Sequence, residues 1–206
     1  MKVIILGGFL GSGKTSVVIQ LAKYIVGETL EDMTKVVILE NEIGEVSVDD
    51  KMLQNSGYEV ANLFSGCVCC TMAGELTIGL HNIIRDFNPE IVIMEATGVA
   101  YPRNIRKTIN QSLPELDCQV TCIADAKRWQ RLLRPMEMLL EGQLEDADTI
   151  LINKTDLVDI DTLAAVKTSI QTFNQHAEIF SISATQTIEP NIFDAMLRTE
   201  TERTLL

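Results

Sequence analysis

The sequence lacks the features that mark membrane-spanning, repetitive and multi-domain proteins. It has no apolar run of membrane-spanning length, no internal repeat, no low-complexity tract and no linker rich in proline, glycine or serine. The first residues, MKVIILGGFL, are apolar only briefly before they reach glycines, so we expect no signal peptide. Without a linker, we expect a single domain over residues 1–206.

Positive charge and cysteine are both scarce. The 17 Lys and Arg residues face 29 Asp and Glu, which gives a net charge of −12 at pH 7. Phosphate backbones and anionic lipid repel an acidic chain, so we expect no nucleic-acid partner and no membrane partner. A chain without an export signal is expected in the reducing cytoplasm, where its 5 cysteines indicate metal binding or reactivity more than disulfides.

Short apolar runs rich in β-branched residues alternate with longer amphipathic stretches. Helical spacing of apolar residues is clearest over 71–87 and 163–173. Alternating strands and helices predict an α/β fold with a doubly wound, mostly parallel sheet. Polar residues follow run after run, at the strand ends where such sheets bind ligands. The runs predicted to be strands are 2–6, 35–39, 90–94, 118–124, 148–152 and 178–183.

The strongest motif is GGFLGSGKT, which follows the first run. Its spacing is that of a phosphate-binding P-loop between a strand and a helix. Glycines let backbone N–H groups turn around phosphate oxygens, Lys14 brings positive charge to the β- and γ-phosphates, and the Thr15 hydroxyl suits Mg²⁺. The alternative is a glycine-rich turn with an incidental lysine. The predicted phosphate-binding residues are Gly8, Gly11, Ser12, Gly13, Lys14, Thr15 and Ser16.

The motif NKTD, after the fifth run, selects the base. The carboxylate of Asp156 only accepts hydrogen bonds, and guanine offers it N–H donors that include the N2 amine. Adenine lacks that amine and would leave the carboxylate unpaired, at a cost of roughly 1–3 kcal/mol. We expect Asn153 to bond the other purine edge, the stem of Lys154 to lie against the ring, and Ser183-Ala184 to border the base. A polar turn is the alternative to this GTP site.

Five motifs together resemble one family. GGFLGSGKT, ENEIGEVSVD, GCVCC, EATGVAYP and NKTD, in this order, look like the CobW-type GTPases, which are P-loop NTPases that handle metals. Many members are called zinc metallochaperones, and they are related to the nickel-insertion GTPases of hydrogenase and urease maturation. The resemblance runs from Met1 to about Ser183. It implies a Cys-X-Cys-Cys metal site, a low intrinsic GTPase rate and metal delivery to a client protein.

The sequence departs from longer members of that family at its C-terminal end. Those members carry a further C-terminal domain, often with a histidine-rich stretch. This sequence has only 2 histidines and no histidine tract. We therefore expect the usual C-terminal domain to be missing.

The residues after the third run are candidates for catalysis. Glu95 ends that run, where such folds place the acidic residue that holds Mg²⁺ or its water, and the alternative is a surface acid. Gly98 offers a backbone N–H to the γ-phosphate. Asp125 is either a cap for the next helix or a nucleotide-side residue. With no arginine placed to neutralise charge, we expect Lys14, Thr15, Glu95 and Gly98 to support slow hydrolysis.

The loop SGCVCC holds the candidate metal site. Cysteines near a helix N-terminus have depressed pKa values and bind soft or borderline metals as thiolates. We expect Cys69 with Cys67 or Cys70 as ligands, completed by Glu40 or Glu45, and Zn²⁺ as the default ion. A reactive thiol cluster is the alternative. Cys118 and Cys122 lie in a predicted buried strand, so we expect them to pack in the core.

These assignments predict a GTP-hydrolysing metallochaperone whose nucleotide state alters its affinity for metal. Its cofactors would be GTP or GDP, Mg²⁺, and Zn²⁺ or another soft-to-borderline transition metal. Its partner would be a client metalloprotein of unknown identity. A nucleotide- or metal-promoted homodimer is a further prediction. Two other functions stay open: a GTP-dependent regulatory switch without metal transfer, and a small-molecule kinase.

Overall fold

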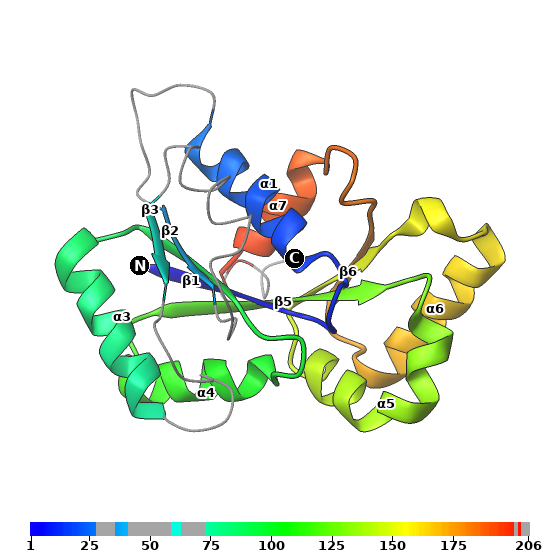
Figure 1. Cartoon of the computed structure of the whole chain (residues 1–206), viewed down its shortest axis with the longest axis horizontal. Coiled ribbons are helices and arrows are strands. Elements are labelled where there is room, and N and C mark those ends of the chain that lie inside the picture. The colour runs from blue at the N-terminus through cyan, green and yellow to red at the C-terminus, as the bar shows by residue number, and fades with distance from the viewer. Residues whose placement is uncertain (28–35, 41–58, 63–72, 200–201, 203–206) are drawn as a thin grey trace.

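A seven-stranded sheet forms the centre of the molecule (Figure 1). The computed structural model describes residues 1–27, 36–40, 59–62, 73–199 and 202. The strand order is β3-β2-β4-β1-β5-β6-β7, and every pairing between neighbours is parallel. This confirms the predicted α/β class and its doubly wound parallel sheet. The strands are β1 Lys2–Gly7, β2 Val36–Glu40, β3 Glu59–Asn62, β4 Ile91–Glu95, β5 Asp117–Asp125, β6 Thr149–Asn153 and β7 Glu178–Ser181.

Six of these strands match the six predicted runs, but β3 was not predicted. Its sequence, EVAN, has only four residues and places polar residues at both ends, so it forms no apolar run. A strand at the edge of a sheet needs only one partner, and β3 pairs with β2 alone among the described strands. At the other edge, β7 ends at Ser181, two residues earlier than predicted.

Helices cover both faces of the sheet (Figure 1). Helices α1 (Lys14–Val26) and α7 (Pro190–Leu197) lie on one face. On the other face lie α3 (Ala73–Phe87), α4 (Pro102–Ser112), α5 (Trp129–Leu144) and α6 (Ile160–Phe173). A short 3₁₀ helix, η1 (Thr155–Leu157), follows β6. No helix in the described part of the chain is both long and apolar enough to cross a membrane.

Two apolar layers form the core, one on each face of the sheet. In β1, Val3 and Ile5 belong to the layer beneath α3, α4 and α5, whereas Ile4 and Leu6 belong to the layer beneath α1 and α7. All four side chains are fully buried, which explains why the run shows no polar alternation.

The two described cysteines confirm the prediction that they pack in the core. Cys118 and Cys122 lie in β5 and belong to the layer beneath α4 and α5. Burial raises the pKa of each thiol to about 12. Both thiols are therefore protonated at neutral pH and unsuited to bind a metal.

The topology brings four loops to one edge of the sheet. Because all strands are parallel, their carboxyl ends meet at this edge. From β1 the chain first runs to β2 and β3, then returns to place β4 on one side of β1 and β5 on the other. The loops after β1, β4, β5 and β6 therefore gather where the direction of winding reverses, the usual ligand position in open α/β sheets.

Candidate nucleotide-binding site

The loop between β1 and α1 has the backbone of a phosphate cradle. Gly8 and Gly13 have φ values of 137° and 102°, in the left-handed region that favours glycine. A Cβ at Gly8 would lie 2.4 Å from the carbonyl oxygen of Ile123, and one at Gly13 would lie 2.3 Å from Nδ2 of Asn153. Neither glycine can therefore be replaced without moving backbone or the asparagine.

The interior of this loop suits an anion. Helix α1 begins at Lys14, so its first N–H groups and the positive end of its dipole face the loop. The Lys14 side chain is 5% exposed, and its Nζ donates to the carbonyl of Gly8 at 3.2 Å. The hydroxyl of Ser12 is fully buried without a hydrogen-bond partner in the described structure, so it is available to a phosphate oxygen. Ser16 lies exposed on the first turn of α1.

Thr15 and Glu95, both predicted to hold Mg²⁺, lie in contact. The Thr15 hydroxyl donates to Oε1 of Glu95 at 3.1 Å. Glu95 ends β4, which pairs directly with β1, and it is 6% exposed. A hydroxyl and a carboxylate beside a phosphate loop are the oxygen ligands that Mg²⁺ prefers, so these residues fit the ion.

Gly98 packs directly against the phosphate loop. A Cβ at Gly98 would lie 2.6 Å from the backbone nitrogen of Leu10, so only glycine allows this approach. The loop that follows β4 and the loop that follows β1 therefore touch through their backbones. Gly98 thus lies against the phosphate loop, and its predicted contact with the γ-phosphate stays a prediction.

Asn153 joins the base motif to the phosphate loop. Its Nδ2 donates to the carbonyl of Ser12 at 2.8 Å, and its Oδ1 accepts from the backbone nitrogens of Lys154 and Ala184 at 2.7 and 2.8 Å. The side chain is 2% exposed. The Asn153 side chain thus holds three loops together. Its predicted bond to the purine stays a prediction, and so does the predicted contact of the Ala184 N–H with the base.

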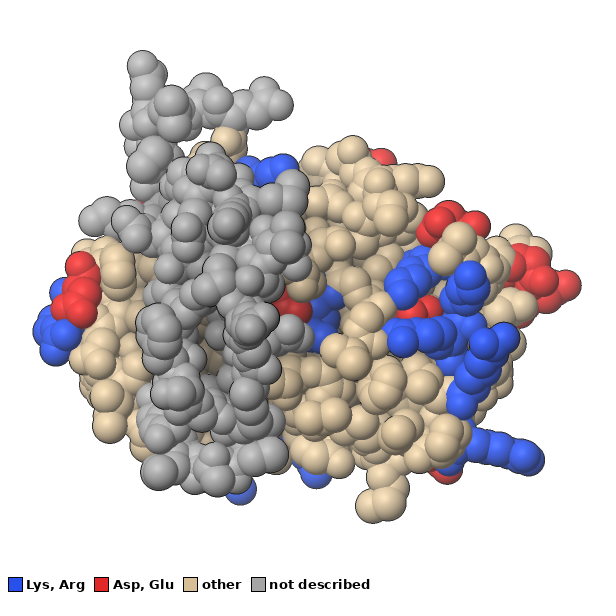
Figure 2. Space-filling model, in the orientation of Figure 1, with Lys and Arg blue, Asp and Glu red and all other residues tan. Residues whose placement is uncertain are grey.

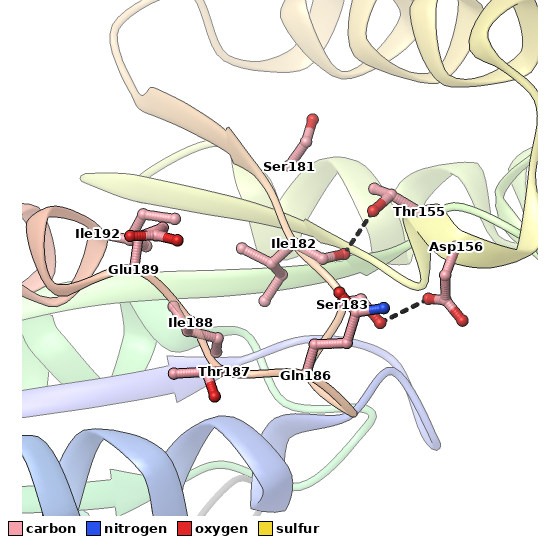
Figure 3. A pocket seen from close by; sticks show the side chains of 10 residues that line it. All are labelled: Thr155, Asp156, Ser181, Ile182, Ser183, Gln186, Thr187, Ile188, Glu189 and Ile192. Carbon is pink, nitrogen blue, oxygen red and sulfur yellow. Dashed lines mark hydrogen bonds between the residues drawn. The ribbon is translucent and has the colours of Figure 1, made fainter.

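Asp156 and Ser183 lie side by side next to a cavity of ≈ 380 Å³ (Figure 3). The Ser183 hydroxyl donates to Oδ1 of Asp156 at 2.7 Å. The Thr155 hydroxyl donates to the carbonyl of Ile182 at 2.9 Å and ties the same two loops together. The chain leaves β7 at Ser181 and reaches the base motif within two residues. The carboxylate predicted to read guanine is therefore held in one orientation.

Lys154 and Arg128 each donate hydrogen bonds to Asp125 and to a backbone carbonyl of the phosphate loop. Lys154 donates to Asp125 Oδ2 at 2.7 Å and to the Gly11 carbonyl at 2.6 Å. Arg128 donates to the same Oδ2 at 2.6 Å and to the Leu10 carbonyl at 2.5 Å. Lys154 adopts a left-handed backbone, with φ 65°, and its ammonium lies over the loop. Its predicted contact with the base ring stays a prediction.

Asp125 is buried at the end of β5 and bonded by two basic side chains. Its side chain is 1% exposed, and burial by itself would raise its pKa, but hydrogen bonds from Lys154 and Arg128 outweigh burial and lower it. Its Oδ1 also accepts from the Arg128 backbone nitrogen at 3.1 Å, as a turn cap does. Asp125 thus closes the turn before α5, whose N-cap is Arg128 without a side-chain cap bond, so the predicted helix cap is wrong and the nucleotide-side role stays a prediction.

Arg128 was not predicted from the sequence. The only local signal was its position three residues after Asp125. Its other partner, Leu10, lies more than a hundred residues earlier in the chain. Figure 2 shows lysine and arginine side chains gathered on this face where β5 ends and α5 begins.

Most of the predicted metal ligands lie outside the described residues. These are Cys67, Cys69, Cys70 and Glu45, and the side chain of Glu40 is not described either. The backbone of Glu40 ends β2 in register with Glu95 of β4. Among the described residues, no group of three His, Cys, Asp or Glu is placed to hold a metal.

Comparisons with known proteins agree with this architecture. A family model described as "CobW/HypB/UreG, nucleotide-binding domain" matches residues 2–181. "Zinc chaperone YeiR" of Escherichia coli is 31% identical over 152 residues, which cover 72% of this chain and 45% of that protein. The chain spans about half the length of the curated relatives it matches.

Two solved structures show the same fold. The hydrogenase maturation factor HypB from Archaeoglobus fulgidus superposes with a TM-score of 0.63 at 16% identity, covering 90% of this chain and 82% of that one. The Zn(II)-bound YjiA GTPase from E. coli superposes with a TM-score of 0.66 at 23% identity, covering 95% and 61%.

Proposed function

The chain belongs to the CobW/HypB/UreG nucleotide-binding family, and from this membership we propose that it is a GTP-hydrolysing metallochaperone with Zn²⁺ as its cargo. The observation that carries the guanine part is the orientation of Asp156 by Ser183, at 2.7 Å, in a base motif tied to the phosphate loop. The names of the relatives, two zinc chaperones and a zinc-regulated GTPase metalloprotein activator, support the metal part.

GTP would bind across the gathered loops. Asp156 would accept hydrogen bonds from the guanine N–H donors, and Lys14 would neutralise charge on the β- and γ-phosphates. The N–H groups between Gly8 and Thr15 would surround the phosphates. This proposal is supported by the rigid connection between the two halves of the site, because the Asn153 bond to Ser12 sets the distance from base to phosphates.

Hydrolysis would rely on positioning more than on acid–base chemistry. Thr15 and Glu95 would hold Mg²⁺, which would neutralise charge on the phosphates when bound. Gly98 would present its backbone N–H to the γ-phosphate. Arg128 lies beside the loop but is engaged by Asp125 and the Leu10 carbonyl, which supports a low intrinsic rate.

Zn²⁺ would be held by loop cysteines together with a glutamate from the end of β2 or the residues that follow it. We assign Cys69, with Cys67 or Cys70, and Glu40 or Glu45 as its ligands. Glu40 is in register with Glu95, which supports a short distance between metal and nucleotide. A client metalloprotein would receive the ion, and a homodimer promoted by nucleotide or metal would supply further ligands.

The test measures Zn²⁺ affinity against a competing chelator, with GDP and with a non-hydrolysable GTP analogue. We expect affinity to differ between nucleotides and to fall strongly when Cys67, Cys69 and Cys70 are all replaced by serine. Cys118→Ala is the matched control, because this buried thiol lies in β5 and should not bind metal. Equal affinity in wild type and triple variant would favour a regulatory switch, and phosphate transfer to a metabolite would favour a kinase.

A further inference from the structure

A buried amide on α5 holds the loop that follows β4. Gln143 is 3% exposed, and its Nε2 donates to the carbonyl oxygens of Gly98 and Ala100, each at 3.1 Å. A glutamine amide has two N–H donors, so both are used on the same short loop. Buried carbonyls need partners, and these two receive theirs from a residue more than forty positions away.

The same loop is fixed at other points. The backbone nitrogen of Ala96 donates to the Leu6 carbonyl at 2.9 Å, and that of Ala100 donates to the Thr97 carbonyl at 3.0 Å. The Thr97 carbonyl and the Gly98 N–H belong to one planar peptide group. Hydrogen bonds therefore hold the peptide that carries the Gly98 N–H and also, through Gln143, the peptide that follows it.

Helix α5 is itself fixed against this loop and the sheet. A Cβ at Gly142 would lie 2.4 Å from Cε1 of Tyr101, so the helix lies tightly on the end of the loop. The Gln143 carbonyl accepts a hydrogen bond from the Cys122 thiol of β5 at 2.8 Å. Gly98 is thus confined between Leu10 on one side and the Gln143 amide on the other.

We infer that Gln143 is a positioning residue that orients the Gly98 peptide for the γ-phosphate and so determines how strongly the site prefers GTP to GDP. This rests on the proposed GTP site. A donor oriented before binding loses little conformational freedom when the phosphate arrives. GDP has no γ-phosphate to accept a hydrogen bond from the Gly98 N–H. Its affinity is therefore independent of Gln143.

The test compares affinities for GDP and for a non-hydrolysable GTP analogue in wild type and in Gln143→Met. Methionine has a similar length but no donors, so the loop loses two hydrogen bonds. We expect the analogue to bind about tenfold more weakly, as the loss of one to two hydrogen bonds would cause. We expect the affinity for GDP to stay within about twofold of wild type. Gln143→Asn, which keeps the amide on a shorter stem, should show an intermediate loss and serves as the milder variant if methionine is not tolerated.

Asn174→Ala is the matched control. Asn174 is also a buried amide, 5% exposed, and its Nδ2 donates to the Leu144 and Ala147 carbonyls at 2.7 and 2.9 Å, in the turn between α5 and β6. It should lower the melting temperature without changing the ratio of the two affinities.

Three outcomes would overturn the inference. An unchanged ratio in both Gln143 variants would overturn it while leaving the proposed function intact. An equal change in Asn174→Ala would reduce the effect to general stability and overturn it as well. Failure of the wild type to bind either nucleotide would overturn both proposals.

Discussion

The Ser183 hydroxyl bonds the Asp156 carboxylate across 27 residues of sequence, at 2.7 Å. This bond occupies one carboxylate oxygen and fixes the direction of the other. A carboxylate held in this way can read the N–H donors of a purine without reorienting. The loops after β6 and β7 thus act as one recognition element.

Asp156→Asn should weaken GTP binding and relax base selection. The substitution replaces an acceptor oxygen with a donor, so the guanine amine loses its partner, at roughly 1–3 kcal/mol, which is about 5- to 150-fold in affinity. Xanthosine triphosphate, which carries an oxygen in place of that amine, should gain affinity. Calorimetric titration with GTP, XTP and ATP measures all three.

Ser183→Ala is the control for orientation and should cause a smaller loss of GTP affinity, because the carboxylate remains. Equal affinities of the wild type for GTP and ATP would remove the guanine assignment.

Arg128→Ala should loosen the phosphate loop and speed the release of both GDP and GTP. The variant loses the bonds to Asp125 and to the Leu10 carbonyl, and because the Arg128 side chain is 37% exposed we expect a modest effect, about fivefold in dissociation rate. This differs from Gln143 variants, which should affect only the triphosphate. Stopped-flow release of a fluorescent nucleotide measures the rate.

Arg131→Ala provides the comparison, since Arg131 is exposed on α5 and has no ion-pair partner among the described residues. Identical nucleotide dissociation rates in wild type and Arg128→Ala would show that the Arg128 hydrogen bonds do not hold the phosphate loop while nucleotide is bound.

Asp125→Asn should reduce stability at neutral pH and change its pH dependence. The folded-state pKa of Asp125 is below the ordinary value of 3.8, so its ionised form stabilises the fold above that pH. The contribution is lost as pH falls through the folded-state pKa. We expect the substitution to lower the free energy of unfolding by roughly 1–3 kcal/mol at pH 7, and by less below about pH 4.

Urea denaturation at several pH values, compared with wild type, tests this. Asp159→Asn is a useful reference, because Asp159 is an exposed cap of α6 that accepts from the Thr162 backbone at 2.7 Å. If wild type and Asp125→Asn differed in free energy of unfolding by the same amount at pH 7 and pH 3, this would contradict the ion-pair account.

Thiol labelling should separate the two groups of cysteines. Cys118 and Cys122 are buried with pKa values of about 12, so a thiol reagent at neutral pH should not modify them in the folded protein. We expect Cys67, Cys69 and Cys70 to react, and Zn²⁺ to protect them.

The triple serine variant should therefore show no reactive thiol when folded and two after denaturation. Rapid labelling of either core cysteine in the folded variant would show that β5 opens readily.

Local pattern was enough to predict most of the sheet and the two nucleotide-binding motifs. The P-loop and NKTD motifs each lie within a few consecutive residues, and the apolar runs of β1, β4, β5 and β6 are long enough to stand out. Strand β3 was missed because four residues with polar ends carry no pattern. Its place in the sheet depends on pairing with β2, a contact that no local window contains.

Periodicity and short motifs were sufficient to predict the family, the parallel α/β architecture and the residue types expected to contact a nucleotide. Only the tertiary structure showed that Arg128 braces the phosphate loop and that Gln143 holds Gly98. The physical reason is distance along the chain: each contact joins a side chain to a backbone carbonyl more than forty residues away, and every residue has such a carbonyl. The partner is therefore chosen by how the strands and helices pack and not by any feature of the partner's own sequence.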